Sequence, residues 1–499
     1  MFSDDLPERV STGVSGLDTV LGGGLAGGCV YLVEGTPGTG KTTLALQFLR
    51  AGAARGETGL YITLSETETE LRAVARSHGW TLEGLAIHEL SDGTLAPDDR
   101  QSVLLPSEIE LGETIERVRD VIVRMSPARV VFDSLSEMRL LADEPLRYRR
   151  QILALKQFLC ERRCTTLLLD DKATSQGDAQ LHSIVHGVIS LHQVAQEFGI
   201  ERRHLRVIKM RGMKFQGGAH DLVLDTGGLR VFPRLVAAEH RTEQVFSPPR
   251  TTGTPALDEL LGGGLSPGTN TLILGPSGIG KTTTAVSCVL AALERGEPAT
   301  YFLFDEGVST LVNRSARLGL DLQPHIDSGA LQLVQVDPAE LSPGEFASRT
   351  VDAVRRHRSR FLVIDSLNAY LLAMPGQPHL LLHVHELLSF LNHQDVTTVM
   401  LMGQHGLVGE VRSDVDLSYL SDVILTLRFF EAGGEIRSAV TCVKSRVAAH
   451  ERQIRELKLG PRGLNVGQRL ADFEGILSGL PHYRGGTPMF DRPNPPGVA

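Results

Sequence analysis

The sequence predicts an α/β protein with two tandem domains, each built on a mostly parallel central sheet flanked by helices. The chain has 499 residues, which is too long for one hydrophobic core and suits two domains of roughly 200–250 residues each. Its two halves repeat the same motifs in the same order, which indicates an internal duplication. Each half alternates short apolar runs with helical patterns, as parallel strands joined by helices do.

In the first half, short apolar runs predict buried parallel strands, and amphipathic patterns predict the helices between them. The expected strands are residues 29–34, 60–64, 129–133 and 165–169, and the expected helices are residues 44–53, 108–125 and 146–161. Residues 187–192 and 205–210 follow, and we expect them to extend the sheet as antiparallel strands. Ligands of such sheets bind at the carboxyl ends of the parallel strands.

The repeat and the loop signals also predict the domain boundaries. The same lysine motif recurs after 240 residues (281 − 41), and Ser247-Pro248-Pro249 interrupts regular structure between the halves. We therefore expect a first domain over residues 1–240 and a second over residues 241–480. The Pro- and Gly-rich residues 481–499 are expected to form a disordered tail.

The composition predicts a soluble, cytoplasmic protein. No apolar stretch is long enough to span a membrane, and the N-terminus lacks the basic start of a signal peptide. The formal net charge of −9 and the pI near 6.0 argue against stable nucleic-acid binding, which needs a basic surface. The 5 cysteines show no C-x-x-C spacing, so we expect buried, reduced thiols.

Each half contains one complete phosphate-binding loop of the form G-x-x-x-x-G-K-[ST], placed after an apolar run and before a helical pattern. The glycines let consecutive backbone N–H groups converge on phosphate oxygens, and the lysine reaches the β- and γ-phosphates. We therefore predict two sites for ATP with Mg²⁺. The nucleotide-binding residues predicted from these loops are Gly35, Thr36, Gly38, Thr39, Gly40, Lys41, Thr42 and Thr43 in the first half and Gly275, Ser277, Gly278, Ile279, Gly280, Lys281, Thr282 and Thr283 in the second.

Two aspartates are predicted to orient the metal ion together with the loop threonines Thr42 and Thr282. Asp133 and Asp365 each end an apolar strand on the side of the sheet where the phosphate-binding loop lies. A carboxylate at that position can orient Mg²⁺ through water. The alternative is that each aspartate caps the helix that follows it.

Carboxylates also end the strand that follows each phosphate-binding helix. Glu66 in the first half and Asp305-Glu306 in the second share the spacing of 240 residues (306 − 66). ATP hydrolysis requires a group that positions, and partly deprotonates, the attacking water. We predict this catalytic role for these residues, with helix capping as the alternative.

A basic pair recurs far along each half, as Lys209 and Arg211 and as Lys444 and Arg446. Solvated strand charges are the ordinary interpretation. Because the pair recurs in both halves, we predict instead that it contacts a nucleotide, either in its own subunit or in a neighbouring one, where cations stabilise transferred phosphoryl charge.

The motifs taken together resemble the KaiC family, the circadian-clock ATPases and autokinases of the RecA-like superfamily. Both halves contain a T-G-x-x-x-L-D segment, G-x-x-x-x-G-K-T-T, a strand-end acidic motif, a D-S strand and a distal K-x-R. The resemblance covers about residues 8–480 and implies two tandem RecA-like P-loop NTPase domains. It further implies a double-ringed homohexamer with ATP between neighbouring subunits, an ATPase first lobe and an autokinase second lobe. KaiB-like or KaiA-like proteins, or a histidine kinase, are the partners that it implies.

The resemblance also transfers individual residues. It adds Ser77 and His450 to the expected nucleotide contacts. Ser65 occupies the position of a family carboxylate, so first-lobe hydrolysis would depend on Glu66 alone. The segment that aligns with the family's autophosphorylated residues contains the candidate phosphoacceptors Ser418, Tyr419 and Ser413.

Two other classes of function fit parts of the sequence. A RecA- or RadA-like DNA-handling ATPase would share the fold and the strand-end glutamate, but the acidic composition and the tandem lobes weigh against it. An ATP-gated, non-catalytic assembly scaffold would keep nucleotide binding without turnover. Ser65 and Tyr419, which depart from the family pattern, keep that alternative open.

Overall fold

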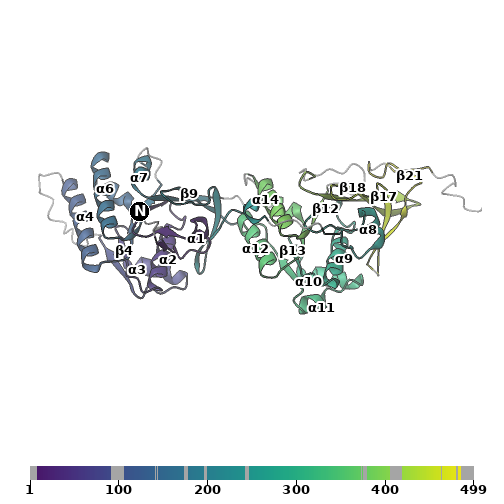
Figure 1. Ribbon diagram of the computed structural model, residues 1–499, viewed down its shortest axis with the longest axis horizontal. Helices are drawn as coiled ribbons and strands as arrows, with labels where there is room; N and C mark the ends of the chain where they lie inside the picture. Colours follow the sequence, from purple (N-terminus) through teal and green to yellow (C-terminus); the bar gives the residue numbers. More distant parts are fainter. Residues whose placement is uncertain are drawn as a thin grey trace, which may run out of the picture. The chain divides into compact units, whose positions relative to one another are not determined.

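The computed structural model describes residues 8–90, 106–140, 142, 144–172, 178–195, 199–241, 247–372, 374, 379–404, 418–461, 463–478 and 481–484. The chain divides into two compact units between Arg234 and Leu235, and each contains one large mixed sheet with helices on its faces (Figure 1). The predicted fold class of two tandem α/β domains is therefore confirmed.

The division lies before the predicted boundary at 240/241, because residues that follow Arg234 pack within the second unit. The short 3₁₀ helix η1 (Ala237–His240) contacts α14 (Leu380–His393). The backbone N–H of Ala237 donates to Glu386 Oε2 over 2.9 Å, and the His240 ring meets the Phe390 ring edge-on with centroids 5.3 Å apart.

The sheet of the first unit has the strand order β11-β10-β9-β8-β3-β7-β6-β4-β5. The strands are β3 (Val30–Gly35), β4 (Gly59–Thr63), β5 (Leu85–Glu89), β6 (Arg129–Asp133), β7 (Thr165–Asp171), β8 (Gly187–Val194), β9 (Arg202–Met210), β10 (Ala219–Asp225) and β11 (Gly228–Phe232). Strands β8 to β5 in this order are parallel to one another, and β9, β10 and β11 are added antiparallel.

The prediction of an antiparallel addition was right for residues 205–210 and wrong for residues 187–192. Strand β8 pairs parallel to β3, with Gly35 opposite Leu191. The helix α7 (Asp178–Ile184) precedes β8, so the chain crosses a face of the sheet and enters β8 from the same end as β3. Strand β9 then returns directly beside β8 and is antiparallel to it.

Helices cover both faces of the first sheet, and their apolar sides form two core clusters. One cluster joins α2 (Lys41–Ala53) and α3 (Glu68–Ser77) to one face. The other joins α4 (Pro106–Met125), α5 (Leu135–Leu140) and α6 (Pro145–Glu161) to the opposite face. Strand β3 is shared, because Tyr31 and Val33 face the first cluster and Val30 and Leu32 face the second, as strand alternation requires.

The second unit repeats this plan with the strand order β14-β13-β15-β16-β12-β17-β18-β19-β20. Its strands are β12 (Asn270–Gly275), β13 (Ala299–Leu303), β14 (Leu331–Gln335), β15 (Phe361–Asp365), β16 (Thr397–Gly403), β17 (Val423–Ala432), β18 (Glu435–Ser445), β19 (Arg455–Gly460) and β20 (Gly463–Arg469). Strands β14 to β17 in this order are parallel, and the last three are antiparallel.

Helices also cover both faces of the second sheet. Helices α8 (Pro255–Leu261), α9 (Lys281–Glu294), α10 (Val308–Arg317) and α11 (Gln323–Asp327) pack on one face. Helices α12 (Pro343–Arg355), α13 (Leu367–Leu372) and α14 pack on the other. Strand β21 (Phe473–Glu474) pairs with β22 (His482–Tyr483), so the predicted disordered tail begins with an ordered strand, and residues 485–499 lie outside the described part.

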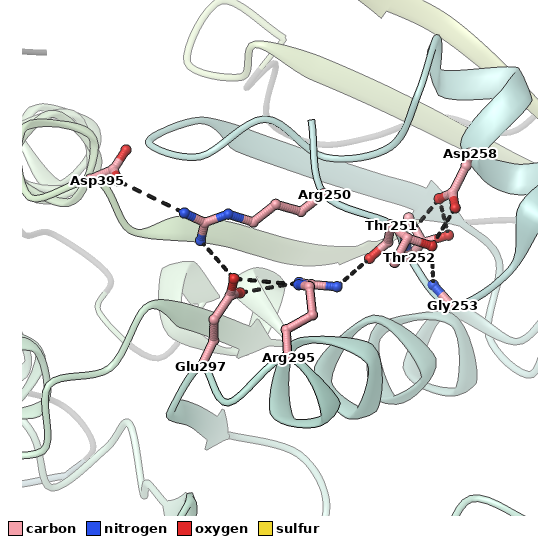
Figure 2. A network of polar contacts seen from close by, with 8 residues as sticks. All are labelled: Arg250, Thr251, Thr252, Gly253, Asp258, Arg295, Glu297 and Asp395. Carbon is pink, nitrogen blue, oxygen red and sulfur yellow. Dashed lines mark hydrogen bonds and ion pairs between the residues drawn. The ribbon is translucent and has the colours of Figure 1, made fainter. Parts of the chain in front are cut away.

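The T-G-x-x-x-L-D segment is fixed by polar contacts, which Figure 2 shows for the second lobe. In the second lobe, Asp258 accepts hydrogen bonds from the Thr251 and Thr252 hydroxyls. Arg295 donates to the Thr251 carbonyl over 2.7 Å and pairs with Glu297, which also pairs with Arg250. This network attaches the segment to the end of α9.

No helix in the described part of the chain is long and apolar enough to cross a membrane.

Candidate functional site

The two phosphate-binding loops connect β3 to α2 and β12 to α9, as the sequence predicted. The residue before each helix is a glycine with positive φ, 100° at Gly40 and 106° at Gly280, a conformation that side chains with a Cβ rarely adopt. The loop lysines lie in the same way in both lobes. Lys41 Nζ donates to the carbonyls of Gly35 and Thr36, over 2.7 and 3.1 Å, and the second lysine repeats this arrangement.

In the second lobe, Lys281 Nζ donates to the carbonyls of Gly275 and Pro276, over 2.8 and 2.9 Å. Burial lowers the pKa of Lys281, and the nearby charges of Asp365 and Asp305 oppose that shift. A cavity of about 1110 Å³ lies over this loop. It is lined by phosphate-loop, strand-end and α10 residues, among them Ser277, Gly278, Gly280, Lys281, Thr282, Thr283, Asp305, Glu306, Arg314, Arg317 and Asp365.

The first lobe differs at its loop lysine, because Lys41 also pairs with Asp171 over 2.8 Å. Asp171 is the last residue of β7, the strand next to β3. This carboxylate was not predicted, because Asp170-Asp171 has no acidic counterpart in the sequence of the second lobe, where β16 ends at Gly403.

The predicted Mg²⁺ ligands come together in the second lobe. Thr282 Oγ1 donates to Asp365 Oδ2 over 2.9 Å, and Tyr301 Oη donates to the same oxygen over 2.8 Å. Burial raises the pKa of Asp365, while these two hydrogen bonds act to lower it. The carboxylate therefore faces the threonine of the phosphate-binding loop.

The first lobe has a related arrangement around Asp133, in which the loop threonine contacts the tyrosine and not the aspartate. Tyr61 Oη donates to Asp133 Oδ2 over 2.5 Å, and the Thr42 hydroxyl forms a side-chain hydrogen bond with Tyr61. Burial raises the pKa of Asp133. The two tyrosines were not predicted, although they share the 240-residue spacing (301 − 61) that marks the other repeated residues.

Glu66 lies just beyond β4, and its backbone is held by Thr63. The Thr63 hydroxyl donates to the Glu66 carbonyl over 2.8 Å and accepts from the Glu66 N–H over 3.0 Å. Thr67, not Glu66, caps α3, through a capping box with Glu70. Burial raises the pKa of Glu66, and the charge of Asp133 raises it further. The carboxylate of Glu66 is thus available for a role other than capping.

In the second lobe, the strand-end carboxylates of Asp305 and Glu306 both have side-chain partners. Ser366 Oγ donates to Asp305 Oδ2 over 2.5 Å, and Glu306 Oε2 pairs with Arg314 Nη2 over 2.8 Å. Burial raises the pKa of Glu306, and Arg314 acts to lower it. Both carboxylates line the cavity that contains Lys281.

The distal cations lie away from the phosphate-binding loop of their own lobe. Lys209 is opposite Val188 in the sheet, whereas Gly35 is opposite Leu191, a separation of about 10 Å along the strands. Lys209 Nζ donates to the carbonyl of His182, and Arg211 donates to the carbonyl of Ser183 over 2.6 Å. Both side chains thus bind the end of α7.

Lys444 has the equivalent position in the second lobe, opposite Ile424. Its Nζ donates to the carbonyls of Ser418 and Ser421, over 2.5 and 2.6 Å. Arg446 is exposed on the loop that follows β18, and its backbone N–H donates to the Asp422 carbonyl over 2.9 Å. His450 lies half-buried on the same loop.

The remaining predicted site residues are Ser77 and the candidate phosphoacceptors. Ser77 ends α3, is exposed, and donates to the Val74 carbonyl over 2.7 Å. Ser418 is half-buried, and Tyr419 is 52% exposed. Ser413 lies outside the described residues. The structure therefore places Ser418, but not Ser77, in direct contact with another predicted site residue.

Comparison with known proteins places the chain among tandem ATPases. The family model described as "ATPase: KaiC" matches residues 10–236 and 250–471. The circadian clock oscillator protein KaiC of Prochlorococcus marinus (strain MIT 9313) is 26% identical over 495 residues, covering 95% of this chain and 96% of the relative. The circadian clock protein KaiC3 of Synechocystis sp. is 27% identical, covering 95% of each chain.

Proposed function

The chain belongs to the KaiC family of ATPases, and from that premise we propose a division of labour between its lobes. The first lobe hydrolyses ATP, and the second transfers the γ-phosphoryl group of ATP to Ser418. The observation that carries this proposal is the contact of Lys444 with the Ser418 and Ser421 carbonyls. It attaches the candidate acceptor to a cation of the kind that stabilises phosphoryl charge.

The proposed assembly is a homohexamer in which each nucleotide lies between two subunits. The register of the sheet supports this proposal, because Lys209 and Lys444 lie away from the loops of their own lobes. A cation in that position serves a nucleotide best when the nucleotide is held by a neighbouring copy. By relation to the clock proteins named above, we propose a role in clock-type or signalling regulation, with Kai-type proteins or a histidine kinase as partners.

The phosphoryl transfer needs a base and a charge-neutralising site. The Ser418 oxygen would bond to the γ-phosphorus as the bond to the β,γ-bridging oxygen breaks and ADP leaves. The serine proton would pass to the carboxylate of Glu306. Thr282 and Asp365 would hold Mg²⁺, which neutralises phosphate charge when bound. Tyr419 presents its oxygen farther from the backbone than serine, so Ser418 is the favoured acceptor.

Replacing Tyr301 with phenylalanine should shift the pH dependence of the second lobe. The variant removes a hydrogen bond that lowers the pKa of Asp365, so this pKa rises. The second lobe needs ionised Asp365, so the pH at which its activity is lost on acidification should rise by about one to two units, since a hydrogen bond to a charged group contributes roughly 1.5–3 kcal/mol. Phosphate release in a Lys41→Ala background measures the profile. Tyr61→Phe is the matched control, and an unshifted profile for Tyr301→Phe would contradict the role given to Asp365.

The kinase proposal is tested by mass spectrometry of the purified protein after incubation with Mg-ATP. The peptide that spans residues 413–428 should gain one phosphate on Ser418. The modification should disappear in Lys281→Ala and persist in Lys41→Ala, because only the second loop serves the transfer. An unmodified peptide with nucleotide demonstrably bound would reject the kinase. If ATP hydrolysis is also absent, the protein is an ATP-gated scaffold, and DNA-stimulated hydrolysis would instead indicate a DNA-handling motor.

A further inference from the structure

The strand-end glutamates of the two lobes have different partners. In the second lobe, Glu306 Oε2 pairs with Arg314 Nη2 over 2.8 Å, and the Glu306 side chain is 20% exposed. In the first lobe, Glu66 Oε2 is buried and has no hydrogen-bond partner in the described part of the chain. Val74 occupies the position equivalent to Arg314 (314 − 74 = 306 − 66). The lobes therefore differ in whether the candidate base is ion-paired.

Helix α10 positions the arginine. The helix begins directly after Glu306, with Gly307 as its N-cap. Arg314 lies two turns along this helix, on the same side as Thr310 and Arg317, since residues three or four apart share a helix face. Thr310, Arg314 and Arg317 all line the cavity over the second phosphate-binding loop. Arg314 can therefore contact the strand-end carboxylate and also border the space in which a triphosphate would lie.

The ion pair has a direct chemical consequence for a base. A carboxylate bound to a guanidinium is stabilised in its charged form and is a weaker proton acceptor. The other charged groups around Glu306 do not replace this effect. Asp305 and Asp365 are acidic, and the Lys281 ammonium is bound to the carbonyls of its own loop. Arg317 also lines the cavity, but within the described part of the chain the ion pair of Glu306 is with Arg314.

We propose that Arg314 is a restraining residue, whose ion pair with Glu306 keeps ATP hydrolysis by the second lobe slower than hydrolysis by the first. This inference rests on the proposed function, in which Glu306 and Glu66 act as bases.

The test uses the full-length Lys41→Ala protein, in which only the second lobe turns over ATP. Arg314→Met keeps the apolar stem and removes the charge. It should raise kcat for phosphate release about fivefold, equivalent to about 1 kcal/mol for a partly exposed ion pair, with little change in KM. The acidic limb of the pH profile should move to higher pH, because Arg314 lowers the pKa of Glu306. Arg314→Lys, which keeps the charge, should stay near the parent rate.

A reciprocal experiment installs the ion pair in the first lobe. In a Lys281→Ala background, Val74→Arg should lower first-lobe kcat about fivefold by the same reasoning, whereas Val74→Leu should not change it. A lower kcat with a raised KM in Arg314→Met would overturn the proposal, because Arg314 would then be binding nucleotide. Unchanged kcat and pH profiles in both lobes would overturn it as well. Failure of the proposed function gives a different result, because the Lys41→Ala parent would then bind ATP without releasing phosphate. In that case the Val74→Arg and Val74→Leu variants of the first lobe would test whether an ion pair slows hydrolysis.

Discussion

Replacing Glu66 with glutamine is expected to reduce ATP hydrolysis by the first lobe roughly 100- to 10,000-fold, the contribution typical of a positioned general base. Glutamine has the same shape but cannot accept a proton from water. The backbone of Glu66 should stay in place, because Thr63 bonds its N–H and carbonyl. The rate is measured as phosphate release in a Lys281→Ala background, with nucleotide binding to the first lobe checked separately.

The same residue predicts a pH dependence. Burial raises the pKa of Glu66, and Asp133 and Glu70 raise it further. A general base acts only when it is deprotonated, so hydrolysis should fall as the pH drops through this pKa. The raised pKa places that fall at a higher pH than for an ordinary glutamate.

Glu68→Gln is the matched control for both measurements. Glu68 lies two residues further on and pairs with Arg72 on the surface of α3, so this variant should keep the parent rate. If Glu66→Gln hydrolyses ATP as fast as the parent, Glu66 is not the base and its position at the end of the strand is only structural.

Replacing Arg129 with methionine is expected to destabilise the first lobe by about 3 kcal/mol, the lower end of the cost of breaking a buried ion pair, because the Glu57 side chain left behind is 31% exposed. The Arg129 side chain is 1% exposed and pairs with Glu57. It also donates to the carbonyls of Ser11 and Phe48, over 2.8 Å each. Methionine fills much of the volume but leaves a carboxylate and two carbonyls without their donor.

The second lobe offers a matched control for this variant. There Arg295 binds the equivalent groups, the Thr251 carbonyl and Glu297, but it lies at the partly exposed end of α9. Arg250 also pairs with Glu297 (Figure 2), so Arg295→Met should cost less, about 1 kcal/mol. Hydrogen exchange of peptides from each lobe of the full-length protein measures both effects separately. Equal losses of protection would contradict the difference in burial.

Much of the fold and of the site follows from local patterns. Apolar runs ending in Asp133 and Asp365, glycines at the positions with positive φ, and the recurrence of Lys41 as Lys281 are all visible in the chain. They led to the mostly parallel sheet, both phosphate-binding loops and the strand-end carboxylates. The direction of β8 did not follow from its composition, because an apolar strand has the same sequence pattern in either direction. Its direction depends on the preceding helix α7, and α7 is too short and polar to give a clear helical pattern in the sequence.

The sequence alone therefore established the duplication, the fold class, the phosphate-binding loops and the family. These properties depend on residue type and spacing, and the duplication makes them visible because each motif occurs in both halves. Tertiary structure alone decided which groups distant in the sequence pair: Lys41 with Asp171, Arg129 with Glu57, and Lys444 with the carbonyls of the Ser418 turn. Such pairs join segments that are brought together by sheet order and helix packing. Spacing along the chain does not encode those contacts, because equivalent partners such as Glu57 and Glu297 are bound by arginines from different elements.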